Sequence, residues 1–300
     1  MLLLWLATIA QAWGPQLHDL RALVATEILI PRAVWFDGQR SPGFETRAWQ
    51  AQVVLSCEPD MGRARKRKTR TACAVEDAAL SAAPLDPGRH DARAELEPIL
   101  GELATYLQQA TVHLITSERG RLLSWSAEGL PEGGPQQTRI GRILAVVLER
   151  ATAGLILERP PEPPPEASQW IERTSPLLRF PDLDTSQAPG VSEQLHEVAL
   201  IGGTIEVYSE GQATLIDPVA DLQMRARVRS QATLRSDGAL LSRSFNVDAT
   251  DGPTVVYHHA GWLRRLAPGE AVELGPDRLV HAPGEDAGDD PLGSPPWPDL

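Results

Sequence analysis

Alternation of apolar and polar side chains along several stretches constrains the fold of this chain most. Successive side chains of a strand point to opposite faces, so a period of two predicts a strand with one buried face. The clearest case is residues 43–57, where one face would carry Trp49, Ala51, Val53, Leu55 and Cys57. Further β-prone stretches lie at residues 20–36, 197–201, 204–208, 213–216, 223–228, 254–257 and 261–266. We therefore expect a mainly β protein.

Two predicted hairpins share the pattern G-x-L-L-S-x-S. One copy begins at Gly120, the last of the turn-forming residues 117–120, and the other begins at Gly238, the last residue of the turn at 236–238. A tight turn followed by a strand favours antiparallel pairing. The pattern fits a duplicated sheet unit, and it equally fits the few residue types that a turn and a following strand accept.

Two segments have the apolar spacing of amphipathic helices, residues 92–109 and residues 138–153. In the second, one face carries Ile140, Ile143, Leu144, Val147, Leu148 and Ala151. Such a face usually packs on a sheet. The predicted fold class is therefore mainly β (α+β), with a large twisted antiparallel sheet or open barrel packed against one or two helices.

The ends of the chain and one internal segment differ from the rest. Residues 1–12 combine an apolar run too short to span a bilayer with small residues before a cut after Ala12, which is typical of a signal peptide. A buried N-terminal helix is the alternative. Residues 13–281 are expected to form a single β-rich domain, with a Pro-rich loop at 159–169. The acidic tail at 282–300 is expected to be disordered.

Cys57 and Cys73 are the only cysteines. Their spacing does not match a redox C-x-x-C pair, and two thiols are too few for a zinc site. In a cytosolic protein they would be inert core thiols, whereas in an exported protein they would form a structural disulfide. Together with the signal peptide, the pair predicts a periplasmic or secreted protein.

A cluster of cations lies between the two cysteines, in a chain whose formal net charge is −12. This net charge disfavours a general nucleic-acid binder. The cluster comprises Arg63, Arg65, Lys66, Arg67, Lys68 and Arg70. It could contact an anionic partner such as lipid head groups or another envelope component. It could also be a solvated hairpin tip.

Catalytic and cofactor-binding motifs are missing from the sequence. The chain has no G-x-S-x-G, no G-x-x-x-x-G-K-[ST], no G-x-G-x-x-G after a strand and no H-E-x-x-H. His258 and His259 are adjacent in a predicted strand, so their side chains would point to opposite faces and suit a structural role. We expect no enzymatic activity, no cofactor and no metal; a secreted hydrolase is the less favoured alternative.

The second half of the chain resembles a group of exported bacterial proteins without an assigned activity. The resemblance lies in the helix 138–153 running into Gly154–Pro160, in Trp170 and Pro176, and in the strand pair 232–241. More distantly, the long amphipathic strands with a hairpin disulfide are similar to the lipid-carrying sheets of lipid-transfer proteins and of periplasmic lipoprotein carriers. Neither resemblance implies catalytic residues.

A large curved sheet with few helices leaves one apolar face that something must cover. The leading hypothesis is an exported envelope protein that holds an apolar ligand, such as a lipid, on that face. Trp49, Val53, Leu55 and Trp125 would then line the cavity, or they would be ordinary core residues. The alternative is a structural or protein-interaction module without a ligand, whose apolar face is sealed by the helices and loops.

Overall fold

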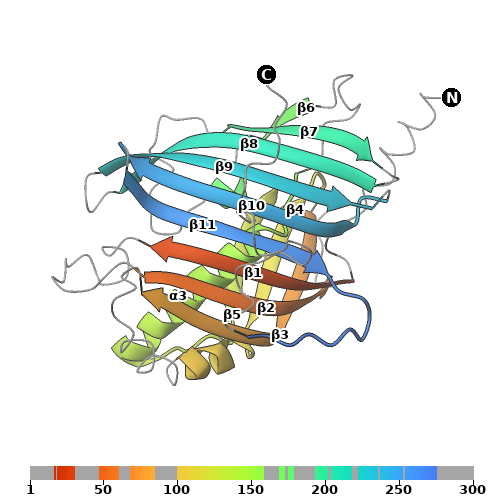
Figure 1. The fold of residues 1–300 in the computed structure, drawn as a ribbon. Coiled ribbons are helices and arrows are strands. Elements are labelled where there is room, and N and C mark those ends of the chain that lie inside the picture. The colour runs from red at the N-terminus through yellow and green to blue at the C-terminus, as the bar shows by residue number, and fades with distance from the viewer. Residues whose placement is uncertain are drawn as a thin grey trace.

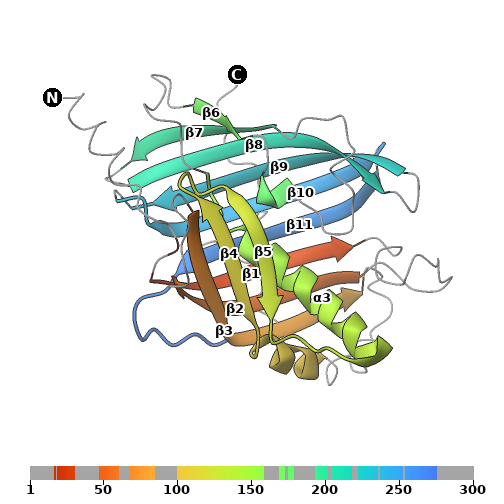
Figure 2. The ribbon, with the colours of Figure 1, turned by 180° about the vertical axis from the view of Figure 1, so that it is seen from behind.

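Eleven antiparallel strands form a single curved sheet that remains open at two edges (Figures 1 and 2). The computed structural model describes residues 17, 19–30, 47–60, 68–84, 100–158, 169–172, 175–178, 193–201, 204–217, 222–235, 237–252 and 254–275. The strand order is β5-β4-β3-β2-β1-β11-β10-β9-β8-β7-β6. The predicted fold class, a large antiparallel sheet packed with helices, is confirmed.

The strands of one half of the sheet are β1 (Leu20–Ile30), β2 (Arg47–Pro59), β3 (Lys68–Pro84), β4 (Thr111–Ser117) and β5 (Leu122–Glu128). The strands of the other half are β6 (Gln169–Glu172), β7 (Glu193–Ile201), β8 (Thr204–Asp217), β9 (Leu222–Leu234), β10 (Leu240–Asp251) and β11 (Thr254–Arg265). Each half is a meander, and the two meanders join where β1 pairs with β11.

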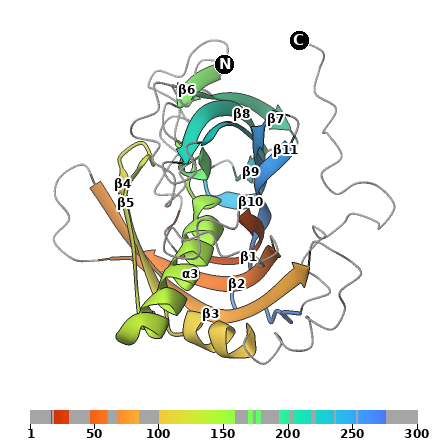
Figure 3. The same cartoon turned by 90° about the vertical axis from the view of Figure 1, so that its left-hand side faces the viewer.

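The connection between the two meanders must cross from one edge of the sheet to the other. Strand β5 forms one edge and β6 the opposite edge. The chain between them contains the helix α3 (Gly134–Ala153), and the short 3-10 helix η1 (Pro176–Leu178) follows β6. Helix α3 lies inside the curve of the sheet (Figure 3). This topology places a helix across the concave face.

Helix α3 matches the predicted helix at residues 138–153 and begins four residues earlier, at Gly134. Its first turn contains a proline, which costs little there because the missing N–H has no helical partner. The second predicted helix, at residues 92–109, is described only over residues 100–107, which are helical; residues 92–99 lie outside the described part.

Both predicted hairpins are confirmed, and each turn depends on the glycine of the shared pattern. Gly120 has φ 81° and Gly238 has φ 83°, a backbone region that other residues rarely adopt. The N–H of Gly120 donates to the carbonyl of Ser117, at 2.9 Å, and the N–H of Gly238 donates to the carbonyl of Arg235, at 2.8 Å. Both glycines therefore help to reverse the chain direction.

Several strands are longer than the sequence pattern predicts. The stretches 204–208 and 213–216 belong to the continuous strand β8, and 254–257 and 261–266 belong mostly to β11. One predicted break contains Gly211 and the other ends just before Gly261, but both glycines pair regularly, Gly211 with Val228 and Gly261 with Thr26 and Phe245. Strands β3 and β6 were not predicted.

The two faces of the sheet differ in polarity. The concave face and α3 share one large apolar cluster. The convex face carries a smaller cluster around Leu23, Val54 and Trp262, against which the segment 266–275 packs. Glu270 anchors this segment: its carboxylate accepts from Arg264 Nη1, at 2.6 Å, and from the backbone N–H of Ala267, at 2.9 Å.

Some sequence predictions fall outside the described residues. These are the signal peptide at 1–12, the acidic tail at 282–300 and nearly all of the Pro-rich loop at 159–169, whose last residue begins β6. The single-domain assignment of residues 13–281 also stays a prediction. Within the described residues, no helix combines the length and apolar character needed to cross a membrane.

Candidate functional site

The contact between α3 and the concave face of the sheet is the candidate site. On the helix, Leu144 and Leu148 are completely buried, because this face of the amphipathic helix points into the curve of the sheet. Facing them on the sheet, Val24, Val53 and Leu55 are also completely buried. The contact is apolar over most of its area, with a few polar groups at one end of the helix.

The four predicted cavity residues have different surroundings. Val53 and Leu55 belong to the apolar cluster beneath α3, and neither lines the two small cavities beside this helix. Trp125 lies on the edge strand β5, packs against the same cluster and lines the smaller cavity. Trp49 lies in β2, opposite Ile28, and its side chain is outside the described part.

Trp125 ties the edge strand β5 to the last turn of α3. Its indole Nε1 donates to Thr152 Oγ1, at 2.9 Å. The Thr152 hydroxyl in turn donates to the carbonyl of Leu148, at 2.7 Å, as threonines in helices often do. One hydroxyl therefore links the helix backbone to the sheet edge.

Arg243 caps the carboxyl end of α3. It projects from β10 into the core and is 2% exposed. Its Nη1 donates to the carbonyls of Gly154, at 3.1 Å, and Ile156, at 2.5 Å. Its Nη2 donates to Ser230 Oγ, at 3.1 Å. Because carbonyls at a helix end lack helical donors and carry partial negative charge, a buried guanidinium is a favourable partner.

The aromatic ring of Phe245 lies between two glycines, one at the end of α3 and one on the sheet. A Cβ at Gly154 would lie 2.6 Å from Phe245 Cε1, and a Cβ at Gly261 would lie 2.7 Å from Cζ. Gly154 has an ordinary helical φ of −64°, so the close approach, not the conformation, requires glycine. The end of α3 therefore reaches the sheet more closely than any other residue type would allow.

His259 lies beside Phe245 on the concave face, with the two ring centroids 4.8 Å apart. Its Nε2 is 3.0 Å from Thr26 Oγ1, and that hydroxyl donates its proton to the carbonyl of Ala260, at 3.2 Å. Nε2 therefore carries the imidazole hydrogen, which it donates to Thr26. Among the described residues, Nδ1 has no hydrogen-bond partner.

The pKa of His259 lies well below its usual value because the ring is completely buried. The positive charge of the buried Arg150, on α3, lowers this pKa further, and His258 adds a smaller effect in the same direction. His258 itself points to the other face, where its Nδ1 is 2.6 Å from the carboxylate of Asp248. The two adjacent side chains thus point to opposite faces of the sheet, as their position in a strand predicted.

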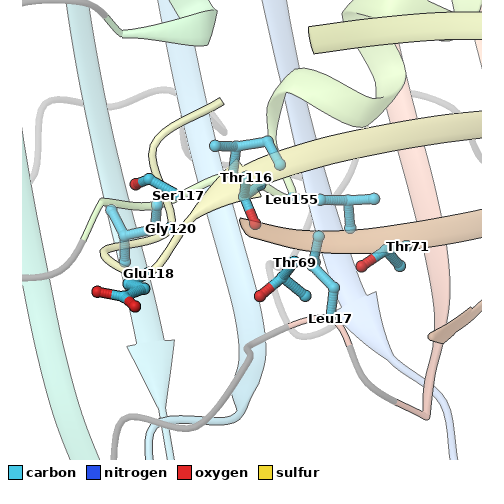
Figure 4. A pocket seen from close by; sticks show the side chains of 10 residues that line it. Leu17, Thr69, Thr71, Thr116, Ser117, Glu118, Gly120 and Leu155 are labelled. Carbon is cyan, nitrogen blue, oxygen red and sulfur yellow. The ribbon is translucent and has the colours of Figure 1, made fainter. Parts of the chain in front are cut away.

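The cavities next to this contact are small. The larger has a volume of about 30 Å³ and lies between the β4–β5 hairpin and the segment after α3 (Figure 4). Its walls include Thr69, Thr71, Thr116, Leu17, Leu155 and Leu157. The second, lined by Trp125 and Thr152, has about 10 Å³. Pockets for drug-sized ligands measure about 300–1,000 Å³, so neither of these two cavities, both lined by described residues, could hold such a ligand.

Cys57 and Cys73 form the predicted disulfide. They are directly opposite each other on β2 and β3, with Cα atoms 4.0 Å apart, and both are buried. Of the basic cluster, Lys68 and Arg70 are exposed at the start of β3. Arg63, Arg65, Lys66 and Arg67 lie outside the described residues.

No metal site is found in the described ranges, since they hold no group of three or more histidine, cysteine, aspartate or glutamate side chains that could bind an ion. Comparison with known proteins adds nothing to this chemistry: no family model matches the chain, and no curated protein matches it. The candidate site therefore depends on its own geometry.

Sequence reasoning missed Arg243, although a signal was present. Along β10, the buried positions alternate as Arg243, Phe245, Val247 and Ala249. An arginine at a core position of an alternating strand requires buried acceptors. The alternation along β10 alone therefore indicates that hydrogen-bond acceptors for Arg243 lie in the segment that packs on this face of the sheet.

Proposed function

We propose that this protein is an exported envelope protein that binds an apolar ligand, such as the acyl chain of a lipid, on the concave face of its sheet. The ligand occupies the space that α3 fills here, in a state in which the helix has moved away from the sheet. The observation that carries the proposal is the position of α3, which lies inside the curve of the open sheet and packs on its apolar concave face, chiefly at β1 and β2.

The two ends of α3 differ in how they are attached, which supports such a movement. The carboxyl end is held by Arg243 and by the Trp125–Thr152 hydrogen bond. The amino end follows Gly129 and Gly133, both with positive φ, and has no side-chain cap. Glycines at a helix start can absorb the backbone rotation that a hinge requires.

Displacement of α3 would expose a continuous apolar surface. Exposing this surface to water costs free energy, and covering it with an acyl chain recovers that free energy. The cavities of about 30 Å³ and 10 Å³ are too small for such a chain. Binding therefore requires the open state, and the apparent affinity depends on how often that state is populated. The disulfide supports export to the periplasm or beyond, where a carrier of this kind would meet lipids.

The substitution Thr152→Val tests this proposal. It removes the hydroxyl that joins α3 to Trp125 while keeping the side-chain shape. A lost hydrogen bond of about 0.5–1.5 kcal/mol favours opening, so the variant should bind a fluorescent fatty acid about two- to tenfold more tightly than the unmodified protein. The matched control is Thr105→Val, which removes a similar helical hydroxyl bond, to Gly101, away from the contact.

A second measurement is native mass spectrometry of protein purified from its own envelope, where we expect a bound lipid. If the purified protein carries no lipid and no variant binds a fatty acid, the proposal is wrong. The concave face would then be a permanently sealed core, as in a structural or protein-interaction module.

A further inference from the structure

One end of the concave face is polar although the rest of the contact is apolar. Arg243 lies on β10, Ser230 on β9 and Ser209 on β8, and all three side chains face the interior. Ser230 accepts a hydrogen bond from Arg243 Nη2 and is paired in register with Ser209. The sheet therefore carries a charged group in a buried polar setting, which remains on the sheet when α3 moves.

The bonding partners of Arg243 change if α3 leaves. In this conformation, the guanidinium donates to two backbone carbonyls directly after the helix, those of the cap residue Gly154 and of Ile156. An arginine stays charged at any physiological pH, so it needs acceptors whenever it is shielded from water. A bound acyl chain would shield Arg243 again, after the helix carbonyls have moved away.

We infer that the ligand is a single-chain amphiphile with a carboxylate head, a fatty acid, and that Arg243 binds this head in place of the carbonyls of Gly154 and Ile156. The inference rests on the proposed function and specifies the ligand for the same site. A carboxylate suits the position because its two oxygens match the planar fork of a guanidinium, and its negative charge adds an attraction that neutral carbonyls lack.

Other charged or polar groups at the contact fit this role less well. Arg150 belongs to α3 and would move with the helix. The Nε2–H of His259 is used by Thr26, and the ring is neutral in its buried position. Arg243 is thus the cation that the sheet offers to a ligand head at this end of the concave face.

The test compares dodecanoate with dodecanol, which share a chain and differ in the charge of the head. Calorimetric titration at neutral pH should give dodecanoate an affinity at least about tenfold higher than dodecanol in the unmodified protein. Arg243→Met should bring this ratio close to one. The control Arg225→Met, at an exposed position of β9, should leave the ratio unchanged.

The ratio separates recognition of the head from opening of the helix, because both ligands require the same open state. If Arg243→Met does not fold, Arg243→Lys keeps the charge and loses the planar fork, so the preference for dodecanoate should decrease but persist. Equal affinities for the two ligands in the unmodified protein would overturn the inference and leave the proposed function intact. Binding of neither ligand would overturn both.

Discussion

Replacing Gly154 by alanine should destabilise the fold, although alanine normally stabilises this backbone conformation. Gly154 has φ −64° and ψ −23°, which any residue adopts. In a helical conformation without steric conflict, glycine to alanine stabilises by about 0.4–1 kcal/mol, because the unfolded chain loses entropy. Here the new methyl would lie 2.6 Å from Phe245 Cε1 and 3.3 Å from Leu263 Cδ2.

The ring of Phe245 is confined on its other side by Gly261, where even a Cβ would lie only 2.7 Å from Cζ. Either the ring or the end of α3 must shift, and α3 is fixed there by Arg243. Overpacking of a filled core costs about 1–3 kcal/mol. Subtracting the entropic gain leaves a net loss of about 1–2 kcal/mol for Gly154→Ala.

Urea unfolding of the oxidised protein measures this loss, and a matched control exists. Gly101 lies at an exposed position of the helix at residues 100–107, and a methyl group there would have no atom within 4 Å, so Gly101→Ala should stabilise. In a double-mutant cycle, Phe245→Leu should remove most of the cost of Gly154→Ala. If Gly154→Ala raises the free energy of unfolding as Gly101→Ala does, the steric argument is wrong.

Three further outcomes can be measured on the same protein. Because the pKa of His259 is lowered, the unfolded chain binds a proton that the folded chain excludes. As the pH falls below the ordinary histidine pKa, the free energy of unfolding should therefore fall by about 1.4 kcal/mol per pH unit. If urea titrations of His259→Gln show the same pH dependence as the unmodified protein, His259 is not its cause. Reducing the Cys57–Cys73 disulfide, which spans 16 positions, should cost about 3 kcal/mol, measured as a shift of the urea midpoint; an unchanged midpoint would mean that the loop is ordered in the unfolded state. Glu270→Gln should speed amide hydrogen exchange at Ala267, because the carboxylate holds the segment 266–275 in place; exchange at the original rate would show that apolar packing alone holds this segment.

The sequence predicts strands well where one face is apolar and the other polar. Residues 47–59 alternate clearly and form β2, and the turn glycines at 120 and 238 mark the two hairpins. Strand β3 was missed because its side chains are small and its alternation is interrupted: the run from Ala72 to Ala83 is rich in alanine, and a bulge opposite Val54 shifts its register. A register shift hides the period of two on which the prediction depends.

The helix was predicted, but its role in the site was not. Periodicity over residues 138–153 gives the apolar face of α3 and says nothing about which surface it covers. That answer comes from the strand order, which only the long-range pairing of β1 with β11 establishes. The polar contacts of Arg243 are likewise non-local, since they join positions 87 and 89 residues apart.

The pairing of β1 with β11 has a consequence for the newly synthesised chain. Residues such as Thr26 and Gly261 meet only after nearly the whole sheet has been made. Until then, β1 is an unpaired edge of a five-stranded half whose backbone donors and acceptors are available to other chains. Such distant contacts also form slowly. A chaperone that shields β1 during this interval would therefore protect the newly made protein from aggregation more effectively than one that shields β5.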